Sequence, residues 1–242
     1  MRLLTLNRPD HANAITVAMA RRLIEQVGLV AADPAVRLLA ITGAGRRVFS
    51  AGADLGEMAD EDALARAYTP IMPDLYEALV LLEKPTLAIL NGTAAGGGLE
   101  LALACDIRLA VAGSRIGLPE IQRGMAAGFG CIMLTRSLPR PMAMRMLFTG
   151  ELLGVEEAAR WGLVEVVPHG DLQERARTLG ESIAAAAPLA VRKLKAIANQ
   201  TAALSIVEAL HAQVGPDLYA SEDRAEGLRA WREKRAPVWR GL

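Results

Sequence analysis

The 242-residue sequence is poor in aromatic side chains, with only three Phe, three Tyr and three Trp. Together with abundant alanine, this scarcity favours closely packed helices over a β-sandwich. The sequence also lacks an excess of charge, because 27 Lys and Arg residues balance 27 Asp and Glu residues. Proteins that mainly bind nucleic acid carry a basic excess, so this balance argues against a nucleic-acid partner.

Cysteine and long apolar runs are scarce as well. Cys105 and Cys131 are the only cysteines, and the apolar run at the N-terminus is too short for a secretory signal. We therefore expect reduced thiols in the core of a cytoplasmic protein. Glu100, Asp106 and Arg108 interrupt the most apolar stretch, so no uncharged run reaches the roughly 18 residues that a membrane span needs. We expect no membrane association.

Several catalytic and ligand-binding motifs are absent too. The sequence has no CxxC pair, no HExxH and no EF-hand loop, which predicts no metal site. It has no GxSxG elbow, which disfavours a serine hydrolase. The triplet Gly96–Gly98 lacks the third glycine of a dinucleotide fingerprint, and no Gly-Lys-Ser/Thr follows it. We expect no cofactor.

Apolar residues make up 52% of the chain and follow two patterns along it. Short strand-like runs alternate with helical patterns over residues 1–170, and only helical patterns remain over residues 171–242. We predict an α/β region followed by a helical region. The predicted strands are Leu3–Leu6, Val36–Thr42, Val48–Ser50, Pro85–Leu90, Ile107–Val111 and Leu163–Val167. The main predicted helices are 16–32, 61–82 (kinked or divided by Pro70 and Pro73), 99–105, 131–138, 141–149, 155–161, 172–185, 188–200, 205–210 and 222–234.

Two of the carboxylic acids in the mostly apolar stretch from Leu87 to Ile121 follow turn-forming residues: Glu100 follows the glycine triplet, and Glu120 follows Pro119. A buried carboxylate is costly unless it is paired or used in chemistry. Two of them suggest an acid/base pair that faces one pocket.

Two glycine-containing turns offer backbone donors for an anion. Glycines that open a helix leave free N–H groups near the positive end of the helix dipole, and Gly97 is so placed. The small residues of the turn Ala51–Asp54 let a ligand approach the main chain closely. If the amides of Ala53 and Gly97 converge, they form a two-donor oxyanion hole.

Each of these features also has a purely structural interpretation. Glu100 could cap its own helix, Glu120 could be a first-turn acid after proline, and both turns could be simple connections. Asp106 and Arg108 are interpreted as a structural pair, and Cys131 as a core residue.

The order of these motifs resembles that of the enoyl-CoA hydratase/isomerase (crotonase) family over nearly the whole chain. The matching segments are Leu6-Asn7-Arg8-Pro9 with Asn13-Ala14, Thr42–Gly45, Phe49–Leu55, Asn91-Gly92, Gly96–Glu100, Cys105–Arg108, Pro119-Glu120, Trp161–Val164, and Glu226-Gly227 through Pro237. The resemblance implies a crotonase-like spiral of β-β-α units and a C-terminal helical trimerisation region, assembled as a homo-trimer or a dimer of trimers.

The same resemblance implies an acyl-CoA ligand and roles for named residues. Ala51, Gly52, Asp54 and Leu55 would bind the substrate, and Lys234 would reach CoA phosphates, also from a neighbouring subunit. The thioester oxygen would lie between the amides of Ala53 and Gly97. Glu100 and Glu120 match the two catalytic glutamates of the hydratases in this family.

The resemblance therefore predicts an enoyl-CoA hydratase of fatty-acid or related acyl-CoA catabolism, which reversibly adds water syn to a 2-enoyl-CoA. An enoyl-CoA delta-isomerase and a non-catalytic acyl-CoA-binding protein are the alternatives. The segment Arg123–Cys131 departs from the family, because it replaces the usual proline-containing glycine loop that borders the acyl pocket. We expect the pocket side of residues 61–82 to set substrate size.

Overall fold

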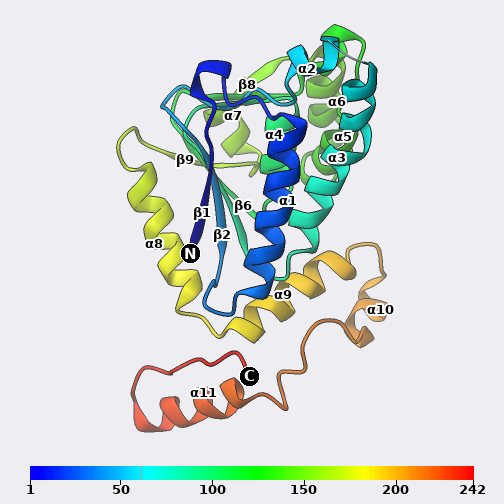
Figure 1. The fold of residues 1–242 in the computed structure, drawn as a ribbon. Helices are drawn as coiled ribbons and strands as arrows, with labels where there is room; N and C mark the ends of the chain where they lie inside the picture. Colours follow the sequence, from blue (N-terminus) through cyan, green and yellow to red (C-terminus); the bar gives the residue numbers. More distant parts are fainter. Residues whose placement is uncertain (61) are drawn as a thin grey trace.

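The structure is a computed structural model that describes residues 1–60 and 62–242. Two sheets form the centre of its fold (Figure 1). A five-stranded sheet has the strand order β1-β2-β4-β6-β9, and a four-stranded sheet has the order β3-β5-β7-β8. The strands are β1 Arg2–Leu6, β2 Leu39–Gly43, β3 Val48–Ser50, β4 Thr86–Leu90, β5 Thr93–Ala95, β6 Ile107–Val111, β7 Arg115–Gly117, β8 Leu152–Gly154 and β9 Glu165–Val167.

Helices connect and cover these strands. They are α1 Val17–Ala32, α2 Leu55–Asp60, α3 Asp62–Leu81, α4 Gly97–Leu103, α5 Gly128–Ser137, α6 Arg140–Thr149, α7 Val155–Arg160, α8 Leu172–Ala184, α9 Pro188–Gln200, α10 Ile206–His211 and α11 Glu222–Glu233, with the 3-10 helices η1 Pro9–His11 and η2 Pro119–Arg123. Among the described residues, we find no helix with the length and apolarity that crossing a membrane requires.

The five-stranded sheet is parallel throughout and is covered on both faces. All of its strand pairs are parallel, and every residue of β2 and β4 is buried. Such strands need helices on both sides. On one face, α1 contributes Ala20, Val27 and Val30 to the main core, and on the other, α8 packs Leu172 and Ala176 against the sheet.

Two buried asparagines hold the loops that follow the strands. The Asn91 side chain, just after β4, accepts a hydrogen bond from the Gly43 N–H at 2.9 Å. The Asn13 amide donates to the carbonyls of Ala44 and Val48 at 3.0 and 2.8 Å. A Cβ on Gly43 would lie 2.8 Å from the Asn13 side chain and 2.9 Å from that of Asn91. The loops at the carboxyl ends of β2 and β4 are therefore fixed to one another and to the entry of β3.

The helices after α8 differ from the rest of the chain. Neither α9 nor α10 buries a residue completely, and Ile206, Leu210 and Trp231 are 81%, 77% and 78% exposed. In Figure 1, α10 and α11 extend away from the two sheets. The α/β region followed by helices agrees with the prediction, whereas the boundary at residue 170 and the trimerisation role of residues 171–242 stay predictions.

Several predicted elements, both long and short, agree with the structure. Helix Pro188–Gln200 and strand Ile107–Val111 have the predicted bounds. The three-residue strands β5, β7 and β8 were not predicted. Glu61, the predicted start of one helix, lies outside the described residues. We expected Pro70 and Pro73 to kink or divide this helix. They do not divide it, because both lie inside α3.

Two side-chain expectations are wrong. Cys105 is buried as expected, but Cys131 is exposed on α5. Asp106 does not pair with Arg108, because its carboxylate accepts hydrogen bonds from the Thr86 N–H and the Lys195 ammonium at 2.7 and 2.8 Å. Arg108 donates instead to backbone carbonyls, including that of Cys105 at 2.7 Å. Each of the two side chains thus holds separate segments of the chain together by hydrogen bonds.

Candidate active site

A cavity of about 600 Å³ lies where the turn after β3, the start of α4, helix α3 and η2 meet. Its wall is largely apolar and includes Met58, Met72 and Tyr76. The carboxylic acids Glu100 and Glu120 both line it. This combination of an apolar wall and a few converging polar groups is typical of small-molecule sites.

The turn after β3 and the start of α4 are in backbone contact. Gly52 has φ +95°, and a Cβ there would lie 2.7 Å from the amide nitrogen of Gly97. Gly96, the residue that precedes α4, also has a positive φ of 56°. Glycine is required at both positions, for the left-handed backbone and, at Gly52, for the close approach as well.

This contact brings two backbone donors to one place. A Cβ built on Gly97 would lie 3.4 Å from the amide nitrogen of Ala53. Among the described residues, neither the Ala53 nor the Gly97 N–H donates a recorded backbone hydrogen bond, whereas the flanking Asp54 N–H donates to Ile15 and the Gly52 carbonyl accepts from Ile15. Both Ala53 and Gly97 line the cavity, so two N–H groups are available to an oxygen bound there.

Glu100 lies in the first turn of α4 and is buried. Its Oε1 accepts a hydrogen bond from the Gly130 N–H at 2.7 Å, and its Oε2 accepts one from the Tyr76 hydroxyl at 3.0 Å. Burial raises the pKa of Glu100, while the hydrogen bonds from Gly130 and Tyr76 oppose that rise by stabilising the ionised carboxylate.

Glu120 lies in the first turn of η2. Its Oε2 is buried and has no hydrogen-bond partner among the described residues. Burial, followed by the nearby charge of Glu100, raises the pKa of Glu120 to about 7, although the Arg123 charge acts in the opposite direction. Its Oε1 faces the glycine turn, since a Cβ on Gly96 would lie 3.0 Å from it.

The two carboxyl groups therefore differ in their tendency to hold a proton. Donors surround the Glu100 carboxylate, and an unpartnered oxygen in a desolvated position favours the protonated form of Glu120. A pair of titratable groups driven apart in this way can act as base and acid near neutral pH.

The structure brings most of the predicted site residues to this cavity but not all of them. Glu100, Glu120, Ala51, Ala53, Gly97 and Leu55 line it. Gly52 lies behind the lining, in backbone contact with Gly97. The Asp54 carboxylate turns away: it pairs with Arg8 at 2.6 Å and accepts a hydrogen bond from the Gly56 N–H in the first turn of α2.

Lys234 is not among the residues that line the cavity of this chain. It ends α11 in the left-handed conformation, and α11 lies far from α4 in Figure 1. A role for Lys234 in a neighbouring subunit stays a prediction.

Sequence reasoning missed two residues that bond Glu100. Tyr76 reaches it from α3 and stacks on Phe129 with ring centroids 4.7 Å apart. Gly130 lies in a glycine-rich segment that sequence reasoning treated only as a departure from the family. The available signal for Tyr76 was its helical spacing from Met72 and Leu79, both buried, but that spacing is equally typical of core residues.

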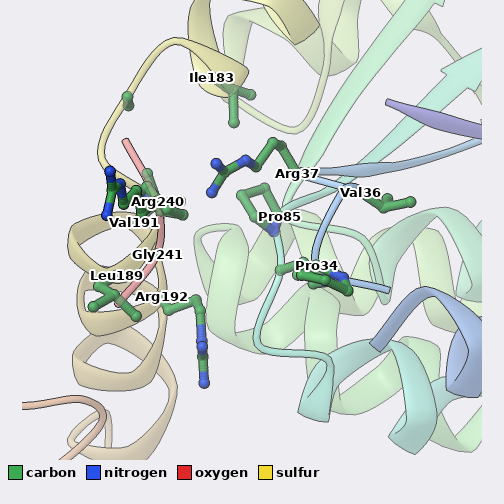
Figure 2. A pocket seen from close by; sticks show the side chains of 13 residues that line it. Pro34, Val36, Arg37, Pro85, Ile183, Leu189, Val191, Arg192, Arg240 and Gly241 are labelled. Atoms are coloured by element: carbon green, nitrogen blue, oxygen red, sulfur yellow. The ribbon is translucent and has the colours of Figure 1, made fainter. Parts of the chain in front are cut away.

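A second cavity has a different chemistry. It measures about 90 Å³ and lies beside the amino ends of β2 and β4, between Pro34–Arg37, Pro85 and the start of α9 (Figure 2). Arg37, Lys84 and Arg192 belong to its lining, which includes no carboxylic acid. It therefore lacks an acid/base pair. Among the described residues, no three His, Cys, Asp or Glu side chains form a group that could hold a metal ion.

Comparisons with known proteins identify relatives of this chain. The family model described as enoyl-CoA hydratase/isomerase matches residues 1–241. The chain is 38% identical to the (E)-benzylidenesuccinyl-CoA hydratase of Thauera aromatica, over 98% of this chain and 94% of that protein. It is 38% identical to the 2,3-dehydroadipyl-CoA hydratase of Escherichia coli K12, over 99% and 94%, and 37% identical to the carnitinyl-CoA dehydratase of the same strain, over 98% and 94%.

Solved structures agree with these relatives. The structure superimposes on an enoyl-CoA hydratase from Bacillus anthracis with a TM-score of 0.94 at 32% sequence identity, covering 99% of this chain and 95% of that one. A whole-chain family match and relatives of this identity over nearly full length leave one assignment: the chain has the crotonase fold and belongs to the enoyl-CoA hydratase/isomerase family.

Proposed function

We propose that this protein is an enoyl-CoA hydratase that adds water reversibly to the double bond of a 2-enoyl-CoA thioester. One observation carries the proposal: a carboxylate with two donors and a carboxylic acid with a pKa of about 7 line the same cavity as two unengaged backbone amides. Relatives named as CoA hydratases and dehydratases support the same reaction class.

The reaction begins at the thioester carbonyl. Its oxygen accepts hydrogen bonds from the N–H groups of Ala53 and Gly97, which withdraw electron density and make C3 of the enoyl group electrophilic. The same donors stabilise the enolate that forms next. Removal of one such donor typically costs about 3–4 kcal/mol of transition-state stabilisation.

The two glutamates divide the proton transfers. Ionised Glu100 takes a proton from water while the water oxygen bonds to C3. Protonated Glu120 delivers its proton to C2 on the same face, which gives syn addition. Glu100 then holds a proton and Glu120 a charge, so exchange of these protons with solvent restores the starting state. Dehydration of a 3-hydroxyacyl-CoA follows the same steps in reverse.

The relatives guide the choice of acyl group. Their names include benzylidenesuccinyl, dehydroadipyl and carnitinyl thioesters of CoA, and the cavity of about 600 Å³ is mostly apolar. We propose an acyl-CoA substrate whose acyl group enters between α3 and η2, with Ala51 and Leu55 beside the CoA portion.

We also propose assembly as a homo-trimer or a dimer of trimers. The exposed apolar side chains of α10 and α11, such as Leu210 and Trp231, support burial against further copies of the chain. In that assembly Lys234 of one copy would contact CoA phosphates bound to another. A cytoplasmic location, in a reducing compartment, remains part of the proposal.

The test is an assay of the purified protein with crotonyl-CoA and with larger enoyl-CoA thioesters. We expect loss of the conjugated thioester absorbance and formation of the 3-hydroxyacyl product. Turnover of 3-enoyl substrates alone would replace the proposal with an isomerase. Tight acyl-CoA binding without turnover of any thioester would replace it with a binding protein.

A further inference from the structure

Tyr76 is the single side-chain donor to Glu100 among the described residues. The Gly130 N–H donates to the other carboxylate oxygen, and the Phe129 backbone makes a smaller contribution to stabilising this carboxylate. A carboxylate has about four lone-pair sites, so these two bonds leave room for a water molecule. Their positions decide how the remaining lone pairs point into the cavity.

We infer that Tyr76 is a positioning residue of the hydration reaction, whose hydroxyl holds the Glu100 carboxylate in the orientation and the ionised state that a general base requires. The inference rests on the proposed function and deepens it. Tyr76 acts through Glu100 and is not itself assigned a proton-transfer step.

The surroundings of Tyr76 make its hydroxyl a fixed donor. The side chain is 2% exposed, and its ring stacks on Phe129 with an interplanar angle of 27°. The hydroxyl also lies 3.3 Å from the Gly97 carbonyl. A phenol has one proton, and the shorter contact to a charged acceptor is the stronger hydrogen bond. The Tyr76 hydroxyl therefore lies between the Glu100 carboxylate and Gly97, the first residue of α4, whose N–H is one of the two amide donors.

Tyr76 stays neutral while it does this. Burial first, and then the charge and hydrogen bond of Glu100, raise the pKa of Tyr76 well above its usual value. The titratable and charged groups recorded around Glu100 in the described part of the chain are Tyr76 from α3 and Glu120 from η2, with Arg123 beside Glu120. Among these side chains, Tyr76 favours the ionised form of Glu100, in addition to the backbone N–H of Gly130.

The direct test is Tyr76→Phe, which keeps the ring and its stacking and removes only the hydroxyl. Loss of a hydrogen bond to a charged group raises the pKa of Glu100 further, so less of the base is ionised at low pH. We expect the acidic limb of the kcat/KM profile to shift by about one unit to higher pH. At a fixed pH on that limb, kcat/KM should then be about ten-fold lower than in the wild type.

Tyr68→Phe is the matched control. Tyr68 lies on the same helix and lines the same cavity, but its hydroxyl bonds Glu57 at 2.7 Å and the Ile15 carbonyl at 3.0 Å. We expect the acidic limb of this variant at the wild-type pH, whatever the change in KM. An unmoved limb in Tyr76→Phe, or an equal shift in both variants, overturns the inference.

A second readout separates this inference from the proposed function. If the wild-type protein hydrates no enoyl-CoA, the proposed function fails. Carbon-13 NMR titration of the Glu100 carboxyl in wild-type and Tyr76→Phe protein then still reports the positioning effect, as a pKa about one unit higher in the variant. Equal Glu100 titration in two folded proteins, verified by circular dichroism, contradicts it.

Discussion

The two glutamates share one cavity but lie in opposite surroundings. On the α4 side, Gly130 and Tyr76 each donate to the carboxylate of Glu100. On the η2 side, one oxygen of Glu120 is buried without a donor in the described part of the chain. The two residues are both glutamates, yet their neighbours favour the ionised form of Glu100 and the protonated form of Glu120. The comparison teaches that donors and burial, more than residue type, distinguish the base from the acid.

Replacement of either carboxyl group by an amide should have the largest effect. Glu100→Gln and Glu120→Gln keep the side-chain shape but remove proton transfer, so we expect kcat for crotonyl-CoA to fall by about 10²–10⁴-fold in each. The exposed Glu25→Gln on α1 is the matched control. Near wild-type activity in either cavity variant would contradict the division of roles.

The backbone contact between the two donor turns comes next. Gly52→Ala places a Cβ 2.7 Å from the Gly97 nitrogen in a left-handed backbone, which should separate the Ala53 and Gly97 amides. We expect kcat to fall by about 10²-fold and the free energy of unfolding to fall by about 1–2 kcal/mol. Steady-state kinetics and denaturant unfolding measure the two effects.

Gly28→Ala is the control for this variant, because a Cβ there meets nothing within 4 Å and the residue lies inside α1. We expect unchanged activity and a gain of about 0.5–1 kcal/mol in unfolding free energy. Equal losses in both variants would contradict the account of the donor turns.

The pH dependence of hydration should reflect the two surroundings. Glu120 must be protonated to deliver a proton to C2, and its pKa is about 7. We therefore expect kcat/KM to fall about ten-fold per pH unit on the alkaline limb, where the pH exceeds the pKa of Glu120. Ionisation of Glu100 gives the acidic limb, so the profile is bell-shaped. A profile that stays flat from pH 6 to 9 would contradict the acid role of Glu120.

The last prediction concerns stability at alkaline pH and not the rate of the reaction. The pKa of Glu120 is raised from 4.5 to about 7, so stability is fullest below the unfolded pKa and is lost as the pH rises through the folded value. We expect Glu120→Gln to increase the unfolding free energy at pH 8 by about 1–3 kcal/mol. Glu100→Gln, which disturbs two hydrogen bonds, should give no such gain in the same denaturant titration.

Sequence reasoning found the features of the site that residue type and local order determine. Glycine before a helix, small residues in a turn and acids in an apolar stretch have direct physical meanings. These features left the spatial meeting of Ala53, Gly97, Glu100 and Glu120 conditional, and only the resemblance to the family implied it. All four residues line the same cavity. Long helices were predicted well because the pattern of α9, for example, extends over 13 residues.

What escaped the sequence depends on contacts between distant segments. Tyr76 lies 24 residues from Glu100, and Gly130 lies 30 residues from it, so no local pattern links them. Asp106 and Arg108 are close in sequence, yet the Asp106 carboxylate accepts a hydrogen bond from Lys195, which is 89 residues away. The strand β5 has only three small residues, too few for a periodic pattern, and its pairing partners define it.

The most direct measurement is a carbon-13 NMR titration of the Glu100 and Glu120 carboxyl groups in the ligand-free protein. We predict that Glu120 titrates near pH 7 and that Glu100 is already ionised at a lower pH. Loss of both protons together near the ordinary glutamate value, or ionisation of Glu120 before Glu100, would contradict the assignment of one acid and one base.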